Sequence, residues 1–193
     1  RRHATHQRCG LRDHLDTIID QIEASSRILQ HGIERLEGND ANPVAVSINE
    51  LVQDLVYIFA SQDEADFEFK TDLDESLPTI YIDDNYLRQV LINLIKNAME
   101  CCEDGGIVRI ATRGKIVING RRHIAVQILD DGPGIPDHQL DTLFHSRPSN
   151  KEDGHAGIGL AIVRDLVEEM GGLISFERSE DEQSRFSIYL PVQ

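Results

Sequence analysis

The sequence predicts an α+β fold: a two-layer sandwich in which a mixed β-sheet carries helices on one face, preceded by a separate amphipathic helix. Three observations lead to this prediction. Helical and strand-like patterns alternate from residue 43 onward. Several strands are joined as hairpins while the helices are kept separate, which indicates a mixed sheet covered on one side. The first 38 residues show a different and purely helical pattern.

The leading segment places its apolar residues at intervals of four and three, the spacing of a helix that packs against another helix. These residues are Leu11, Leu15, Ile18, Ile22, Leu29 and Leu36. One helix cannot bury such a stripe alone, so we expect a partner, either the same helix of a second subunit or a helix upstream. Gly38 and Pro43 bound a predicted linker. The chain therefore divides into a helix, residues 1–38, and a globular domain, residues 39–193.

The globular domain begins with a helix and two strands. Ser47, with Glu50 three residues later, predicts a capping box and a helix that continues to about residue 60. Alternating apolar and polar residues then predict a strand over residues 67–73, and residues 79–82 predict a short second strand.

A long helix and a hairpin form the middle of the domain. We expect the helix over residues 84–103, with its buried face marked by Leu87, Leu91, Leu94 and Ala98. Strands are predicted over residues 107–112 and 123–129, and the dipeptide Asn119-Gly120 predicts a turn between them.

The last third of the chain contains a polar stretch, a helix and two strands. A short helix over residues 137–144 precedes the polar stretch, which continues to Ala156. The helix that follows extends to Met170 and ends at Gly171-Gly172. Its predicted apolar stripe consists of Ile158, Ile162, Leu166 and Met170. Strands over residues 173–177 and 185–190 complete the predicted sheet.

The composition argues against several classes of function. The formal net charge is −15 and the pI about 4.8. We therefore do not expect nucleic-acid binding, since that affinity comes largely from Lys and Arg. The three cysteines have neither disulfide-framework nor zinc-ligand spacing, which favours reduced thiols in a cytoplasmic protein. Neither a signal peptide nor an apolar run near the ~20 residues of a membrane span is visible, although the parent protein could still be membrane-anchored.

Two asparagines on the long helix point to a metal and phosphate site. Asn93 and Asn97 lie four residues apart, so their carboxamides share one face of the helix, with Glu100 a turn further on. Magnesium prefers oxygen ligands and keeps several waters, so one carboxamide plus phosphate oxygens is a sufficient ligand set. The alternative is that both asparagines are ordinary solvent-facing residues.

An Asp-Gly segment, residues 130–135, follows a strand and points to recognition of a base. The Asp130 carboxylate can accept a hydrogen bond from an exocyclic amine such as that of adenine. Gly132 and Gly134 would let a planar base approach the backbone without a clash with Cβ, and Ile135 could pack on it. A plain surface turn is the alternative, because Asp, Gly and Pro dominate turns.

A third segment resembles a phosphate-binding loop. Gly157, Ile158 and Gly159 lie directly before a helix, where free amide N–H groups and the helix dipole attract anions. The polar stretch before them is long enough to form a lid, and Lys151 is one of its cations that could reach the phosphates. A solvated loop is the alternative for that stretch.

The order of these segments, namely the asparagine helix, Asp-x-Gly-x-Gly, a lid with a phenylalanine and a Gly-x-Gly helix, resembles the catalytic ATP-binding domain of bacterial sensor histidine kinases. That family shares the Bergerat nucleotide-binding fold with gyrase-type ATPases. The resemblance covers residues 43–192. It also makes the leading helix similar to the second helix of the dimerisation and phosphotransfer module of these kinases.

The resemblance implies a role for each site residue, with ATP and Mg²⁺ as the ligands. Asn97 would bind Mg²⁺, Asn93 and Glu100 would line the phosphate side, and Asp130 would hold the adenine amine. Gly132 and Gly134 would form the floor of the pocket. The residues implied to flank the phosphates are Gly157, Gly159 and Leu160.

Position 93 favours a kinase over an ATPase. The gyrase-like members resemble one another in carrying Glu four residues before the metal-binding Asn, as a base for water, whereas this chain carries Asn93. We therefore expect a histidine kinase domain that transfers the γ-phosphoryl group to a histidine outside this chain, for relay to a response regulator. No histidine here carries the family's acceptor pattern, and His14 comes nearest. A homodimer is expected. The alternative is a degenerate kinase that binds nucleotide as a switch or scaffold.

Overall fold

A computed structural model describes residues 43–61, 67–102, 105–144, 159–178 and 183–192. All of them except Gly159 belong to one compact unit, Ala41–Phe144 with Leu160–Gln193. The predicted leading helix, residues 1–38, lies outside the described residues, as do Lys151, Gly157 and Ile158. The elements in chain order are β1 (Val44–Val46), α2 (Ile48–Ala60), β2 (Phe67–Asp72), β3 (Ile80–Ile82), α3 (Asp84–Cys101), β4 (Gly106–Ile118), β5 (Arg121–Asp130), α4 (Asp137–Leu140), α5 (Gly159–Glu169), β6 (Leu173–Arg178) and β7 (Ser184–Pro191).

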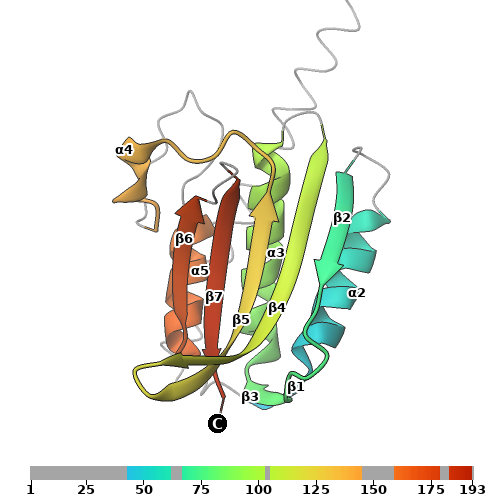
Figure 1. The fold of residues 1–193 in the computed structure, drawn as a ribbon, viewed down its shortest axis with the longest axis vertical. Coiled ribbons are helices and arrows are strands. Elements are labelled where there is room, and N and C mark those ends of the chain that lie inside the picture. The colour runs from blue at the N-terminus through green and yellow to red at the C-terminus, as the bar shows by residue number, and fades with distance from the viewer. Residues whose placement is uncertain (1–42, 62–66, 103–104, 145–158, 179–182, 193) are drawn as a thin grey trace, which may run out of the picture. The chain divides into compact units, whose positions relative to one another are not determined.

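The main sheet has five strands in the order β2-β4-β5-β7-β6. Strands β2 and β4 are parallel, and the other neighbours are antiparallel. Helices α2, α3 and α5 all lie on the same face of this sheet (Figure 1). The prediction of an α+β sandwich with a mixed sheet and helices on one face is therefore confirmed.

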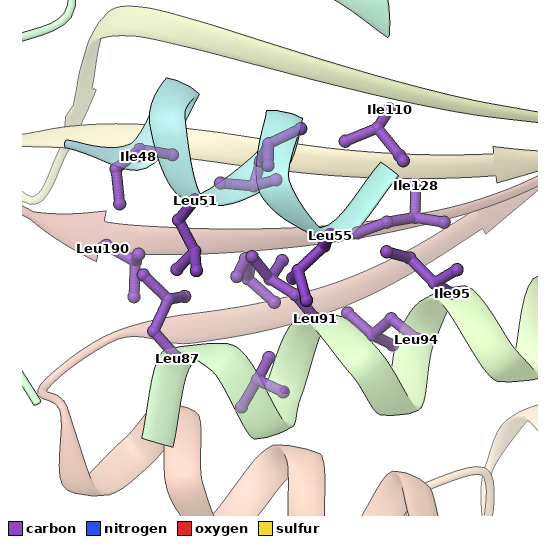
Figure 2. Packing of buried hydrophobic residues seen from close by; sticks show 14 of the residues in the cluster. Ile48, Leu51, Leu55, Leu87, Leu91, Leu94, Ile95, Ile110, Ile128 and Leu190 are labelled. Atoms are coloured by element: carbon purple, nitrogen blue, oxygen red, sulfur yellow. The ribbon is translucent and has the colours of Figure 1, made fainter. Parts of the chain in front are cut away.

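The hydrophobic core fills the space between the sheet and the helices. Leu51 and Leu55 of α2 point toward Leu87 and Leu91 of α3, above the strands (Figure 2). The sheet contributes fully buried residues from its three central strands: Val108, Ile110, Ile124, Val126, Ile128, Ile188 and Leu190. The predicted buried face of α3 is confirmed, because all four of its marked residues are buried.

The two long N-terminal helices begin differently. Ser47 occupies the N-cap position of α2, but its side chain makes no capping hydrogen bond, so the predicted capping box is wrong. The next polar residue, Asn49, instead points inward and bonds the main chain at Asp74. Helix α3 has a true cap, because Asp83 Oδ1 accepts the N–H groups of Asn85 and Tyr86 at 3.0 and 3.1 Å.

The hairpin between β4 and β5 forms as predicted but is longer. Asn119 and Gly120 form its turn with φ of +50° and +76°, the left-handed geometry that this dipeptide favours. Strand β4 continues past the predicted end at residue 112 because a bulge between Arg113 and Ile116, with Lys115 at φ +60°, restores pairing beyond it. Helix α4 ends at Leu140, short of the predicted residue 144.

Two further features differ from expectation. Strand β1 lies just after the predicted linker and pairs with β3 in a separate two-stranded sheet. The buried residues of α5 are Ala161, Val163, Leu166 and Val167. Of the stripe predicted for this helix, Leu166 is buried, whereas Ile162 and Met170 only border the core. A helix that rests on a broad sheet buries a different arc from one packed along a narrow seam.

The end of α5 is stopped by glycine, as predicted. Gly171 has φ +71°, and the N–H groups of Gly171 and Gly172 bond the carbonyls of Glu168 and Val167 at 2.9 and 2.8 Å. Among the described residues, no helix is both long and apolar enough to cross a membrane.

Candidate functional site

The Asp-Gly segment and the end of α3 lie at one end of the main sheet (Figure 1). Strands β5 and β6 end there, β4 and β7 begin there, and α3 ends beside them. Asp130 of β5 is opposite Ser184 of β7, which is opposite Arg178 of β6. Directly opposed residues point to the same face of a sheet, so these three side chains share the helix-covered face.

Asp130 is a buried carboxylate with one oxygen uncommitted. Its side chain is 2% exposed. Its Oδ1 accepts the N–H of Gly132 at 3.1 Å. Its Oδ2 and the Ser184 hydroxyl are both buried, and neither has a hydrogen-bond partner in the part of the chain that the structure describes. An unpaired buried acceptor costs free energy, so a donor supplied from outside would stabilise this group.

The electrostatics of Asp130 follow from its burial. Burial raises the pKa of Asp130 to about 6, against the opposing hydrogen bond from Gly132, and the neighbouring charge of Asp131 raises it further. The Ser184 hydroxyl is near enough to lower this pKa, although the two groups do not reach hydrogen-bond geometry. Asp130 is therefore mostly ionised at neutral pH and is a pure acceptor there.

The neighbouring Asp131 has a structural role. Its Oδ1 accepts hydrogen bonds from the Ile107 N–H at 2.9 Å and from the Cys102 thiol at 3.3 Å. Burial is the largest single influence and would raise the pKa of Asp131, but the hydrogen bonds from Ile107 and Cys102, together with the charge of Arg109, outweigh it and lower that pKa. Asp131 therefore joins the start of β4 to the end of α3, directly beside Asp130.

The adjacent Cys101 and Cys102, at the end of α3, are thiols that stay protonated at neutral pH. Burial is the main cause that raises the pKa of Cys101 to about 11 and that of Cys102 to about 12. Both are free rather than joined in a disulfide. Both have a structural role, since Cys101 packs against Gly132 and Cys102 bonds Asp131.

Gly132 and Gly134 of the Asp-Gly segment must be glycine for two different reasons. A Cβ on Gly132 would lie 2.8 Å from the Cys101 carbonyl oxygen and 2.9 Å from the Cys101 Cβ. The segment and α3 therefore touch backbone to backbone at this point. Gly134 has φ +77°, a conformation that other residues rarely adopt. Glycine is thus required at both positions by the chain itself.

Asn93 and Asn97 share one side of α3 with Cys101. Asn93, Asn97 and Cys101 follow one another at intervals of four, so they form one stripe along the helix. Because Cys101 touches Gly132, this stripe lies on the side of α3 that meets the Asp-Gly segment. Both asparagines are half-buried, whereas Glu100 is exposed. The structure therefore brings Asn97 and Asp130 to the same end of the fold.

The remaining predicted residues lie near this end or outside the described chain. Ile135 is half-buried and packs against the hydrophobic core. Gly159 is the first residue of α5, and Leu160 after it also packs against the core. Helix α5 ends where β6 begins, so its first turn lies at the end of the sheet where β6 stops. That turn contains no acidic residue.

Two polar residues of this end were missed by the sequence analysis. Ser184 and Arg178 are remote from the Asp-Gly segment in the sequence, and only the register of β5, β7 and β6 brings them together. The apolar alternation of the last two strands was visible, but which of their residues face Asp130 was not.

The donor set of the site suits a nucleotide better than a protein-bound metal ion. Among the described residues, no three His, Cys, Asp or Glu side chains lie close enough to hold a metal. A cation here would need carboxamide and ligand oxygens, and Asn97 offers the former. The vacant acceptor of Asp130 fits an amine donor, as on adenine.

Comparison with known proteins agrees with this geometry. Residues 82–193 match the model of the histidine kinase-, DNA gyrase B- and HSP90-like ATPases. The chain is similar to the sensory histidine kinase/phosphatase NtrB of Proteus hauseri, with 32% identity over 95% of this chain and 53% of that protein. NtrB of Escherichia coli O157:H7 is 31% identical over the same shares. The chain therefore spans about half the length of these relatives.

A solved structure shows the same fold. The crystal structure of full-length ShkA in complex with AMPPNP matches with a TM-score of 0.65 and 26% identity, over 77% of this chain and 31% of that one. The family model covers more than half of the chain, including α3, the Asp-Gly segment and α5. The chain belongs to the histidine kinase-, DNA gyrase B- and HSP90-like ATPase family and resembles the catalytic domain of sensor histidine kinases.

Proposed function

We propose that this domain binds Mg-ATP and transfers its γ-phosphoryl group to a histidine of a separate segment. The observation that carries the proposal is the buried Oδ2 of Asp130, which lacks a partner among the described residues at the end of the sheet where Asn97 also lies. This atom accepts the exocyclic amine of adenine. Guanine carries a carbonyl at the equivalent position and would leave two acceptors facing each other, so ATP is favoured over GTP.

The phosphates extend from the adenine toward α3. Asn97 holds the metal ion through its carboxamide oxygen, and Asn93 and Glu100 line the phosphate side. When bound, Mg²⁺ neutralises charge on the phosphate oxygens. Gly157, Ile158 and Gly159 offer backbone N–H groups, Leu160 supports them, and Lys151 adds a cation. ATP and Mg²⁺ are thus the ligands that we propose.

Transfer depends on positioning more than on covalent protein chemistry. The bond between the γ-phosphorus and the bridging oxygen breaks, a bond forms from phosphorus to the unprotonated imidazole nitrogen, and ADP leaves. The other ring nitrogen then loses its proton to solvent. Asn93 cannot take up a proton, which disfavours activation of water and therefore hydrolysis. The ShkA complex with AMPPNP and the names of the NtrB relatives support a nucleotide-dependent kinase.

The partners follow from the same proposal. The acceptor histidine belongs to a helix of the same protein outside this chain, and a response regulator receives the phosphoryl group afterwards. Residues 1–38 supply one helix of a dimerisation module, so the protein acts as a homodimer, and residues 39–193 form the catalytic domain. We place the domain in the cytoplasm, where ATP is present.

A transfer assay tests the proposal directly. The domain is mixed with a phosphoacceptor helix pair supplied as a separate polypeptide, together with Mg²⁺ and ATP labelled at the γ-phosphorus. Acid-labile label on histidine is the expected result. ATP binding without transfer would instead favour a nucleotide-dependent switch or scaffold, and acid-stable label would indicate a serine kinase of related fold.

A further inference from the structure

Arg178, the last residue of β6, bonds the end of the Asp-Gly segment and the start of α4. Its Nη2 donates a hydrogen bond to the carbonyl oxygen of Ile135. The same nitrogen lies 3.3 Å from Oδ1 of Asp137, the first residue of α4. One guanidinium group therefore holds both ends of the segment from residue 135 to residue 137.

Arg178 lies at the same level of the sheet as Asp130, the carboxylate that we propose binds adenine. Arg178 is opposite Ser184, and Ser184 is opposite Asp130, so all three side chains project from one face at one level of the sheet. Ile135 directly follows Gly134, which has the left-handed φ of +77°. The Ile135 side chain packs against the core, and its carbonyl oxygen is held by Arg178.

The interaction is too exposed to be explained by stability. The side chains of Arg178 and Asp137 are 41% and 84% exposed. Exposed ion pairs contribute little to folding, because water screens the charges and the long side chains lose entropy. A planar guanidinium that bonds a carbonyl and a carboxylate together nevertheless fixes geometry.

We propose that Arg178 is a positioning residue for the adenine side of the nucleotide site. It holds Ile135 at the height of the base, so that the base lies against Ile135 while its amine meets Asp130. This inference rests on the proposed function, because it assumes that adenine occupies the site. It assigns to β6 a part in nucleotide binding that the motifs of the sequence did not indicate.

Arg113 offers a matched control within the chain. Its side chain is 44% exposed, it pairs with the Asp72 carboxylate, and it donates to the main-chain carbonyls of Asp72 and Thr112 at 3.0 and 2.8 Å. Like Arg178, Arg113 is a partly exposed guanidinium that bonds a carboxylate and main-chain carbonyls. Arg113 belongs to β4, next to the edge strand β2, whereas β6 forms the other edge of the sheet.

The experiment compares four variants in the whole chain: R178A, R178K, D137N and R113A. ATP and tripolyphosphate affinities are measured by calorimetry with Mg²⁺, KM and kcat by the transfer assay, and Tm by thermal unfolding. We expect R178A to weaken ATP binding and raise KM about tenfold, because Ile135 is then no longer held against the base. Its kcat at saturating ATP and its affinity for tripolyphosphate should not change, because only the base side is disturbed.

The other variants separate geometry from stability. D137N keeps the bond to Ile135 and should weaken ATP binding less than R178A, R178K should fall between wild type and R178A, and R113A should bind ATP as the wild type does. Every Tm should stay within about 3 °C of the wild type. ATP binding by R178A equal to that of the wild type would overturn the inference, as would equal losses of affinity in R178A and R113A. Failure of the wild type to bind ATP would instead reject the proposed function itself.

Discussion

Two carboxylates of this fold, Asp74 and Asp130, differ in their hydrogen bonding and in their burial. Asp74 is half-buried in the turn after β2, and both of its carboxylate oxygens are bonded. Its Oδ1 accepts the N–H and hydroxyl of Ser76 at 2.9 and 2.6 Å, and its Oδ2 accepts the N–H of Gly114 at 3.0 Å. Asp130 is buried, and within the described part of the chain its carboxylate accepts one hydrogen bond, from Gly132. The hydrogen bonds from Ser76 lower the pKa of Asp74, whereas burial raises that of Asp130.

The surroundings of Asp74 form a closed network. Thr112, fully buried, accepts the N–H of Asp74 and donates to Asn49 Oδ1, both at 2.9 Å, and Asn49 in turn donates to the Asp74 carbonyl. This network ties α2 to the main chain of Asp74 and to the sheet, while Ser76 and Gly114 bond the two oxygens of the Asp74 carboxylate. A carboxylate whose hydrogen bonds are complete has a structural role, whereas the incomplete hydrogen bonding of Asp130 indicates a place for a ligand.

The largest expected difference between the two carboxylates is in how each makes the free energy of unfolding depend on pH. The folded pKa of Asp130, about 6, exceeds the ordinary value of 3.8, so folding favours its protonated form. Protonated Asp130 therefore stabilises the fold at low pH. As the pH rises from 3.8 to 6, the free energy of unfolding falls by about 3 kcal/mol in total. Asp74 has a lowered pKa, so its contribution is lost only as the pH falls below 3.8.

Denaturant unfolding of wild type and Asp130→Asn at pH 4 and pH 7 measures this effect. The variant cannot titrate at this position, so its free energy of unfolding should gain about 2 kcal/mol relative to the wild type between these pH values, the larger part of the total. A constant difference between the two proteins would show that Asp130 titrates normally.

The next largest effect concerns nucleotide affinity. Asp130→Asn replaces a charged acceptor by a neutral amide, and hydrogen bonds to charged groups contribute about 1.5–3 kcal/mol, so ATP affinity should fall by roughly 10- to 100-fold. The Tm at pH 7 should not fall, because a buried charge is removed. Calorimetric titration with ATP measures the affinity, and Asp74→Asn, expected to bind ATP normally, is the control.

The closed network should show the reverse pattern. Thr112→Val leaves the Asp74 N–H and the Asn49 Oδ1 without their partner and should destabilise the fold by about 1–3 kcal/mol. ATP affinity should stay at the wild-type value, as measured by the same titration. If Thr112→Val weakened ATP binding as much as Asp130→Asn does, the distinction between the two regions would be wrong.

The smallest expected effect is at Ser184. Its buried hydroxyl has no hydrogen-bond partner among the described residues and faces Asp130. A bound base or a water molecule would give it a partner, so Ser184→Ala should weaken ATP binding about threefold to tenfold. Titration at pH 7, where Asp130 is ionised in both proteins, measures it. Tighter ATP binding by the variant would count against a role for this hydroxyl.

The parts of the fold that were predicted from sequence depend on local chemistry. The buried face of α3 follows from the spacing of its apolar residues, and Asn119-Gly120 specifies its own turn. Strand β1 was missed because three residues gain their structure only by pairing with β3. The arc that α5 buries is likewise set by the sheet beneath it.

The candidate site divides in the same way. Asn97, Asp130 and Gly132 stand in recognisable motifs, so the sequence indicated them. Ser184 and Arg178 owe their place to strand register, which no local pattern encodes. The roles of Gly157, Ile158 and Lys151, which lie outside the described residues, stay predictions.

Calorimetric titration of the wild-type chain with ATP and with GTP, each with and without Mg²⁺, tests the central claim most directly. We predict that ATP binds at least about tenfold more tightly than GTP, since Asp130 offers only an acceptor. We also predict that ATP binding strengthens with Mg²⁺ and that the preference for ATP is lost in Asp130→Asn. Equal affinity for the two nucleotides in the wild type, or an unchanged preference in the variant, would contradict the account.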